Sequence, residues 1–139
     1  MQSLNTKDYD ALIFTSANAV RFLKLKNQDK SIKCFCVGTL TERALRMKGF
    51  NNTTAASGTV NALKNIIINS EKKIKNLAYL CGDIISYDLD KELTYEGFKV
   101  RKIVNYNSTK ILECNSESIS LLKKYPANFV FIYSKRSAE

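Results

Sequence analysis

Short apolar runs alternate with amphipathic segments along the whole of this 139-residue chain. The apolar runs have the length of β-strands, and the segments between them show the i, i+3, i+4 spacing of helices. A strand that is followed by a helix and then by another strand forms a right-handed β-α-β unit, and successive units build a parallel sheet. The pattern predicts strands at 11–14, 34–37, 50–54, 77–81, 98–106 and 129–133, and helices at 18–26, 40–48, 60–68, 87–96 and 115–124.

Small or hydroxyl-bearing residues stand where four of the predicted strands end. They are Thr15-Ser16, Gly38-Thr39 with Thr41, Gly82-Asp83, and Ser134. Because the carboxyl ends of parallel strands meet at one edge of a sheet, these junctions come together, and helix N-termini at such edges bind anions. At any single junction helix N-capping is the favoured explanation of the hydroxyls, because every helix needs a cap, whereas several such junctions at one edge favour a ligand site. The run Thr15-Ser16-Ala17-Asn18 is the main candidate for an anion site.

The composition excludes several kinds of site. The chain has no histidine, which excludes Ser-His-Asp and Cys-His catalysis and histidine-based metal sites. Its four cysteines lack C-x-x-C spacing, so we expect buried thiols in a reducing compartment. Neither G-x-x-x-x-G-K-[ST] nor G-x-G-x-x-G occurs, so nucleotide cofactors are not expected. The sequence contains no apolar run that could span a membrane and no signal peptide, so we expect a cytoplasmic protein that does not bind membranes.

The formal net charge of +9 points to an acidic partner or to a solvated basic surface. The Lys and Arg residues are scattered over helix ends and loops, and no helix-turn-helix, zinc-finger or RNP-type signature accompanies them. We therefore expect no nucleic-acid partner, although a basic α/β module that binds nucleic acid remains the alternative from another class of function.

Candidates for acid-base chemistry are few. Asp83, Asp88 and Asp90 stand near one junction, but Asp88 and Asp90 also suit a helix start, where acids interact favourably with the dipole. Tyr106 ends the long basic strand, where a phenol can donate a hydrogen bond to a leaving oxygen or simply pack as an aromatic ring.

The order and spacing of these residues resemble the motifs of the uroporphyrinogen-III synthase family. The stretches that carry the resemblance are Asp10-Ala11-Leu12-Ile13-Phe14-Thr15-Ser16-Ala17-Asn18-Ala19-Val20, Val37-Gly38-Thr39-Leu40-Thr41, Tyr79-Leu80-Cys81-Gly82, Gly97-Phe98-Lys99-Val100, Val104-Asn105-Tyr106 and Phe131-Ile132-Tyr133-Ser134. The resemblance implies a two-lobed hydro-lyase of haem biosynthesis without metal or organic cofactor. Its substrate would be hydroxymethylbilane, a polycarboxylated linear tetrapyrrole, which loses water and closes to uroporphyrinogen III with inversion of ring D.

The resemblance also implies which residues form the site. Tyr106 would assist departure of the hydroxyl group. The substrate-binding residues would be Thr15, Ser16, Ala17, Asn18, Thr41, Gly82, Asp83 and Ser134. Two positions depart from the family pattern: Glu42 replaces a small residue after the threonine, and Ser86 stands where many members have a basic residue.

The resemblance covers only part of the family's length. It implies a flavodoxin-like parallel α/β lobe at 1–100 that lacks its first strand-helix unit, an interlobe crossover at 101–110, and the start of an incomplete second lobe at 111–139. We expect a truncated or partial member, whose missing segments a separate polypeptide could carry. The alternative is a non-catalytic remnant that binds tetrapyrrole or partners.

Overall fold

The computed structural model describes residues 3–27, 29–70, 72–109 and 113–132. The chain forms two compact units, Met1–Ser108 and Thr109–Glu139. The first unit contains the 3-10 turn η1 (Thr6–Asp8), the strands β1 (Ala11–Phe14), β2 (Lys33–Val37), β3 (Thr53–Ala56), β4 (Asn76–Gly82) and β5 (Lys99–Tyr106), and the helices α1 (Ala17–Arg21), α2 (Gly38–Met47), α3 (Val60–Ile68) and α4 (Leu89–Tyr95). The second unit contains α5 (Ser116–Lys124).

The five strands form one parallel sheet in the order β3-β2-β1-β4-β5. From β1 the chain builds outward to β3 and then returns to the other side of β1 to add β4 and β5. This result confirms the predicted α/β fold with a parallel, flavodoxin-like sheet. The reversal places β1 and β4 side by side although their following helices lie on opposite faces.

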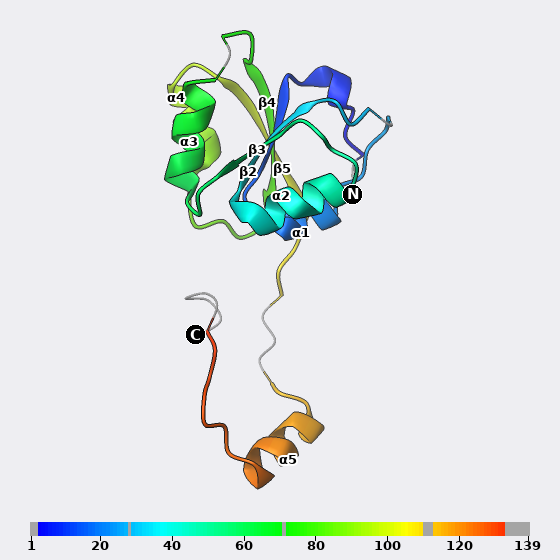
Figure 1. Ribbon diagram of the computed structural model, residues 1–139, viewed down its shortest axis with the longest axis vertical. Coiled ribbons are helices and arrows are strands. Elements are labelled where there is room, and N and C mark those ends of the chain that lie inside the picture. The colour runs from blue at the N-terminus through cyan, green and yellow to red at the C-terminus, as the bar shows by residue number, and fades with distance from the viewer. Residues whose placement is uncertain (1–2, 28, 71, 110–112, 133–139) are drawn as a thin grey trace. The chain divides into compact units, whose positions relative to one another are not determined.

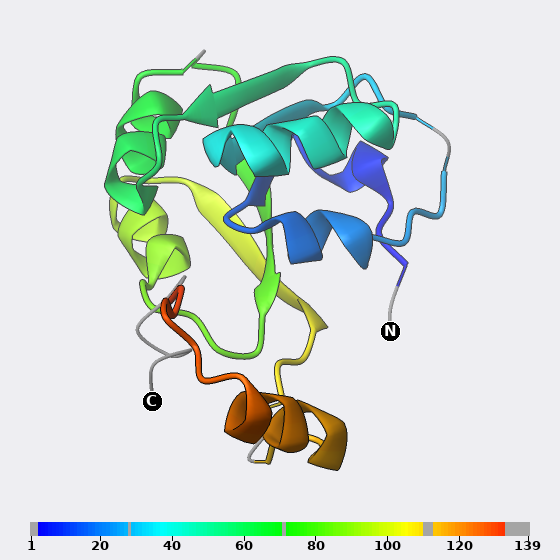
Figure 2. The same ribbon diagram turned by 60° about the horizontal axis from the view of Figure 1, so that its bottom comes forward.

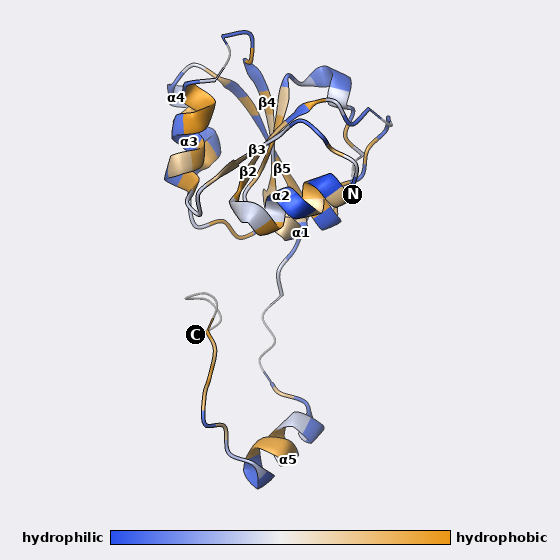
Figure 3. Ribbon diagram, viewed as in Figure 1, coloured by the Kyte–Doolittle hydropathy of each residue, from blue (hydrophilic) through white to orange (hydrophobic). Residues whose placement is uncertain are grey.

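Two helices cover each face of the sheet, with α1 and α2 on one face and α3 and α4 on the other (Figures 1 and 2). Alternate side chains of β1 point to opposite faces: Leu12 and Phe14 pack toward α1 and α2, whereas Ala11 and Ile13 pack toward α3 and α4. All four are fully buried, which is why this strand is an unbroken apolar run. The helices mix polar and apolar colours, as expected when one face of a helix is buried (Figure 3).

Helix α1 is shorter than the predicted segment 18–26, because tertiary contacts redirect the chain after Arg21. Lys48 Nζ donates hydrogen bonds to the carbonyls of Arg21 (2.9 Å) and Leu23 (3.3 Å), and Leu25 forms an isolated parallel bridge with Leu4. These contacts satisfy carbonyl groups at the end of the helix and replace further helical turns.

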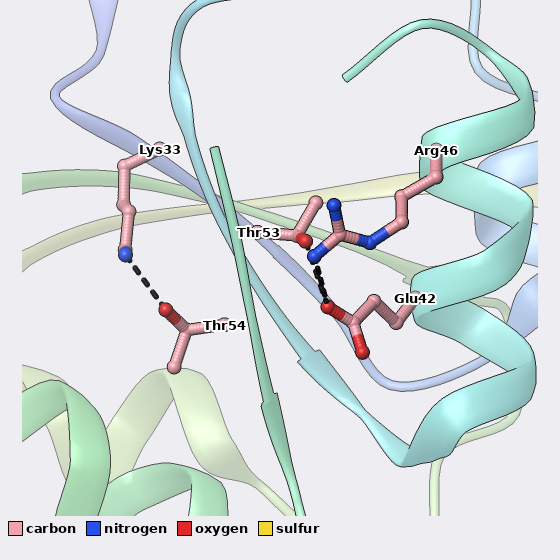
Figure 4. Close-up of polar contacts among 5 residues, drawn as sticks. All are labelled: Lys33, Glu42, Arg46, Thr53 and Thr54. Carbon is pink, nitrogen blue, oxygen red and sulfur yellow. Dashed lines mark hydrogen bonds and ion pairs between the residues drawn. The ribbon is translucent and has the colours of Figure 1, made fainter. Parts of the chain in front are cut away.

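The edge strand β3 is tied to the sheet and to α2 by side-chain contacts (Figure 4). The Glu42 carboxylate on α2 accepts hydrogen bonds from Thr53 Oγ1 (2.9 Å) and Arg46 Nη2 (2.8 Å). On the other side, Lys33 Nζ donates to Thr54 Oγ1 (2.6 Å). Glu42 therefore braces an edge strand, which gives a structural reason for the residue that departs from the family pattern. The strand lies at 53–56, later than the predicted 50–54.

The cysteines of the first unit are buried thiols. Cys34 and Cys36 share the face toward α1 and α2, as their alternation with Phe35 predicts, and Cys81 lies on the opposite face. Burial raises the pKa of the Cys34 thiol to about 12 and that of Cys36 to about 11, because a thiolate would lose its hydration there. These groups are neutral packing residues at physiological pH.

The second unit contains one helix, α5, among its described residues, and Asn115 caps it by accepting a hydrogen bond from the Ser118 amide (2.7 Å). The predicted strand at 129–133 is wrong for its described part, since 129–132 form no strand. A β-strand requires a neighbouring strand for its backbone hydrogen bonds, and the described part of this unit offers none. Tyr133, the last residue of the predicted strand, lies outside the described residues. The predicted domain boundaries at 100 and 110 stay predictions.

Candidate functional site

The carboxyl edge of the sheet opens between β1 and β4. After β1 the chain continues to α1 on one face of the sheet, and after β4 it continues to α4 on the other face. Ligands of parallel α/β sheets bind in the crevice between two such strands. A cavity of about 190 Å³ lies there, which we call the Tyr106 cavity. It is lined by Thr15, Ser16, Val60, Tyr79, Gly82, Ile84, Ile85, Ser86, Tyr87 and Tyr106.

The Tyr106 ring lies directly against the backbone of Gly82. A Cβ atom added at Gly82 would stand 2.7 Å from Tyr106 Cζ and 2.9 Å from its hydroxyl oxygen, so a larger residue does not fit without displacing the ring. The ring also stacks with Phe22 at a centroid distance of 6.0 Å and an interplanar angle of 21°. Gly82 and Phe22 therefore hold the phenol in one place at the edge of the sheet.

Ser16 links this phenol to helix α1. Ser16 Oγ accepts a hydrogen bond from the Ala19 amide (3.2 Å) as the N-cap and lies 3.0 Å from the Tyr106 hydroxyl. A serine hydroxyl has one proton and can give it to the tyrosine oxygen while it accepts from the amide. In that arrangement the proton of Tyr106 is free to be donated to a ligand.

The same cavity contains a second pair of hydroxyl groups in contact with each other. The hydroxyl of Tyr79 on β4 lies 3.2 Å from Thr15 Oγ1. Tyr79 is 2% exposed, and burial raises its pKa to about 12, because the phenolate would lose its hydration. Tyr79 therefore stays protonated and fixes the orientation of Thr15 at the end of β1.

An irregularity in β5 aims Tyr106 into this site. Cys81 pairs with Val104 but Gly82 pairs with Tyr106, so Asn105 is an extra residue in a β-bulge. The Asn105 side chain is buried, and its Nδ2 donates a hydrogen bond to the carbonyl of Ala19 (2.7 Å). Two consecutive residues of β5 are thus both tied to α1.

The structure brings four of the predicted site residues together, namely Thr15, Ser16, Gly82 and Tyr106. The other predicted residues lie elsewhere. Ala17 faces a groove between α1 and α2, Asn18 is exposed and accepts a weak hydrogen bond from Arg21, Thr41 is buried on α2, and the exposed Asp83 carboxylate accepts from the amides of Ile84 (3.0 Å) and Ser108 (2.9 Å). Ser134 lies outside the described residues.

Sequence reasoning missed Tyr79 and Asn105. Tyr79 is the one hydroxyl-bearing residue within β4. That hydroxyl is a signal of a candidate site residue, but the apolar run around it indicates a plain core strand. Asn105 is an amide next to the candidate tyrosine on an otherwise exposed strand. Nothing in a single sequence shows that this strand contains a bulge.

The Tyr106 cavity is rich in hydroxyl groups and uncharged. Six of its ten lining residues carry a hydroxyl, and none is Lys, Arg, Asp or Glu. Among the described residues, no group of three or more His, Cys, Asp or Glu side chains could hold a metal ion. The arrangement can donate and accept hydrogen bonds, and it gives an anionic ligand no direct ion pair.

Comparison with known proteins identifies the family. The family model described as "Uroporphyrinogen-III synthase HemD" matches the chain over residues 1–139. This match confirms the resemblance that the sequence motifs indicate. No curated protein matches the chain. No helix within the described ranges is long and apolar enough to cross a membrane.

Proposed function

Because the chain belongs to the uroporphyrinogen-III synthase family, we propose that it binds hydroxymethylbilane and assists its closure to uroporphyrinogen III. The reaction removes water from the terminal hydroxymethyl group and inverts ring D. It is the activity of a hydro-lyase in haem biosynthesis, and we place it in the cytoplasm. Whether this chain acts by itself or with a further polypeptide is part of what the experiment below decides.

The observation that carries this proposal is the position of the Tyr106 hydroxyl. It lies 3.0 Å from Ser16 Oγ, over a glycine that leaves room for the ring, in the crevice where open parallel sheets bind ligands. A hydroxyl leaves carbon more readily when a hydrogen-bond donor stabilises the charge that develops on its oxygen. Tyr106 is the donor at this site whose ring both Gly82 and Phe22 contact.

We propose the following roles. Ser16 donates to the oxygen of Tyr106, and Tyr106 donates its own proton toward the oxygen of the departing hydroxyl group. As the carbon–oxygen bond breaks, the oxygen leaves as water and the pyrrole nitrogen lone pair stabilises the carbon cation. A pyrrole carbon of ring D then attacks this cation and forms the new carbon–carbon bond. The proton that ring D releases as it regains its pyrrole form returns to Tyr106. The order of ring closure depends on how the substrate is held, so positioning contributes more than acid-base strength.

The experiment is to supply freshly made hydroxymethylbilane to the purified chain and to measure the ratio of the III to the I isomer. Uncatalysed closure gives the I isomer, so an excess of the III isomer supports the proposal. Only the I isomer would mean that the chain by itself is not a working synthase. The same assay with a candidate second polypeptide tests whether the activity requires both.

Tyr106→Phe is the decisive variant, because it keeps the ring against Gly82 and Phe22 and removes only the hydroxyl. We expect formation of the III isomer to slow by about a hundredfold to a thousandfold, since one preorganised donor is lost. Tyr95→Phe is the matched control, because Tyr95 is 92% exposed and its side chain makes no hydrogen bond within the described part of the chain. Equal rates for both variants would remove Tyr106 from the mechanism.

A further inference from the structure

A second cavity lies on the face of the sheet that α1 covers. It has a volume of about 220 Å³ and lies between η1, the segment 22–26 and β5; we call it the Asn105 cavity. Its apolar wall includes Phe22, Leu80 and Ile103. Drug-sized sites have volumes of about 300–1,000 Å³, so this cavity suits one small ring and not a whole tetrapyrrole.

Asn105 lines this cavity and has an unused acceptor. Its side chain is 5% exposed, and Nδ2 donates to the Ala19 carbonyl, which sets the orientation of the amide. Oδ1 is buried and has no hydrogen-bond partner among the described residues. A buried acceptor without a donor is unfavourable by about 1–3 kcal/mol, so a ligand that carries an N–H group would relieve this cost.

Three cations surround the same cavity. Lys24 and Lys26 are exposed, and neither has a side-chain partner among the described residues. Arg101 donates a long hydrogen bond to the Tyr9 hydroxyl (3.4 Å). Asp8 is the one acidic residue among those that line the cavity, so the lining has a net positive charge. The uncharged Tyr106 cavity offers no such charges.

We propose that the Asn105 cavity binds a carboxylated pyrrole, with the ring N–H donating to Asn105 Oδ1 and the carboxylate meeting Lys24 and Lys26. The flat ring packs against the apolar wall, the N–H group of the ligand binds the buried acceptor, and its carboxylate binds the lysines. This assignment rests on the proposed function in one respect, because it identifies the pyrrole as one ring of the linear tetrapyrrole.

The two cavities are connected by Phe22 and by the bulge in β5. Phe22 lines the Asn105 cavity and stacks on Tyr106, and Asn105 precedes Tyr106 in the bulge. A tetrapyrrole ring held at Asn105 would therefore keep the neighbouring part of the substrate close to the hydroxyl of Tyr106. The charged ring site and the neutral hydroxyl site would together position the substrate.

The experiment is a binding titration that does not depend on turnover. The ¹⁵N-labelled chain is titrated with a pyrrole that bears one propanoate side chain, and the side-chain amide signals of Asn105 are followed by NMR. Matched ligands are its N-methyl derivative, which lacks the donor, and its methyl ester, which lacks the charge. We expect each change to weaken binding by about three- to tenfold.

Variants separate the two contacts. Replacing both Lys24 and Lys26 by Ala should weaken binding of the acid by about three- to tenfold and leave binding of the ester unchanged. Lys72→Ala is the control, because Lys72 is exposed and does not line the cavity. Asn105→Ala should remove the difference between the pyrrole and its N-methyl derivative, and the lysine variants decide the question if it does not fold.

The outcomes are distinct from those of the isomer assay. Equal binding of the acid, the ester and the N-methyl derivative, or binding at another surface, would overturn the assignment, as would a cavity that takes up only water. The chain could also bind the pyrrole at Asn105 and yet form no III isomer. This result would support the assignment of the Asn105 cavity and would contradict the proposed reaction.

Discussion

Gly82→Ala is the substitution whose effect the structure defines most closely. Gly82 is not among the glycines with positive φ, so its backbone accepts alanine without strain. The whole cost must come from the new methyl group, which would stand 2.7 Å from Tyr106 Cζ. Carbon atoms normally approach to about 3.5–4.0 Å, so the ring must retreat by roughly 1 Å.

Such a shift separates Tyr106 from Ser16, whose hydroxyl groups are 3.0 Å apart. Loss of this hydrogen bond together with overpacking should lower the free energy of unfolding by about 1–3 kcal/mol. The assay is urea unfolding followed by circular dichroism, with the slope checked to be unchanged. Formation of the III isomer should fall in parallel.

A double-mutant cycle tests the cause. In a Tyr106→Ala background the methyl group meets no ring, so Gly82→Ala should be neutral, or stabilising by up to about 1 kcal/mol through the lower entropy of the unfolded chain. The expected coupling energy is therefore at least about 1 kcal/mol. The same loss of stability in both backgrounds would refute the steric argument, because the cost would then lie in the strand itself.

Three further predictions concern the rest of the first unit and the thiols. The Asp10 carboxylate accepts hydrogen bonds from the amides of Asn76 (2.8 Å) and Lys75 (2.9 Å), and these bonds lower its pKa. The stabilisation that Asp10 contributes is therefore present above its pKa in the unfolded chain and is lost as the pH falls through its pKa in the folded chain. Asp10→Ala should cost about 1 kcal/mol at pH 7, and urea unfolding should show the difference shrinking below about pH 4. Glu42→Ala should cost about 0.5–1.5 kcal/mol and speed amide hydrogen exchange in β3, and unchanged exchange would contradict its role as a brace. With a thiol reagent, we expect one fast-reacting thiol in the folded chain, that of the exposed Cys114, and four in urea; fast reaction of the others would contradict their burial.

The sequence predicts elements best where local signals and tertiary contacts agree. The pattern predicts a helix at 60–68, and α3 is observed at Val60–Ile68. Apolar residues recur there at helical spacing, and Thr59 caps the first turn by accepting a hydrogen bond from the Ala62 amide (3.2 Å). Helix α1 shows the reverse case. Its periodicity continues past Arg21, but Lys48 donates hydrogen bonds to the carbonyls there. No local pattern reveals this contact, because Lys48 stands at the end of α2, far away in the sequence.

The candidate site shows why residues can be nominated from a sequence while their geometry cannot. The junction pattern predicts Thr15, Ser16 and Gly82 at one edge of the sheet, and the family resemblance adds Tyr106. The topology brings these four residues together. Strand alternation, however, places consecutive residues on opposite faces of a sheet. Ile103 packs toward α1 and α2, so a regular β5 would direct Tyr106 toward the opposite face, away from Ser16.

The bulge at Asn105 reverses that outcome. One extra residue between Val104 and Tyr106 turns the tyrosine to the face of α1, and the same residue uses its own amide to hold the Ala19 carbonyl. Deleting Asn105 should therefore restore regular pairing and move the phenol out of the Tyr106 cavity, with loss of the Ser16 contact and of the buried amide together. Substitution of Asn105 by Ala should keep the extra residue and so keep the tyrosine in place. A comparison of the two variants by Tyr106 side-chain NMR distinguishes the length of the strand from the chemistry of the amide as the cause of the site's geometry.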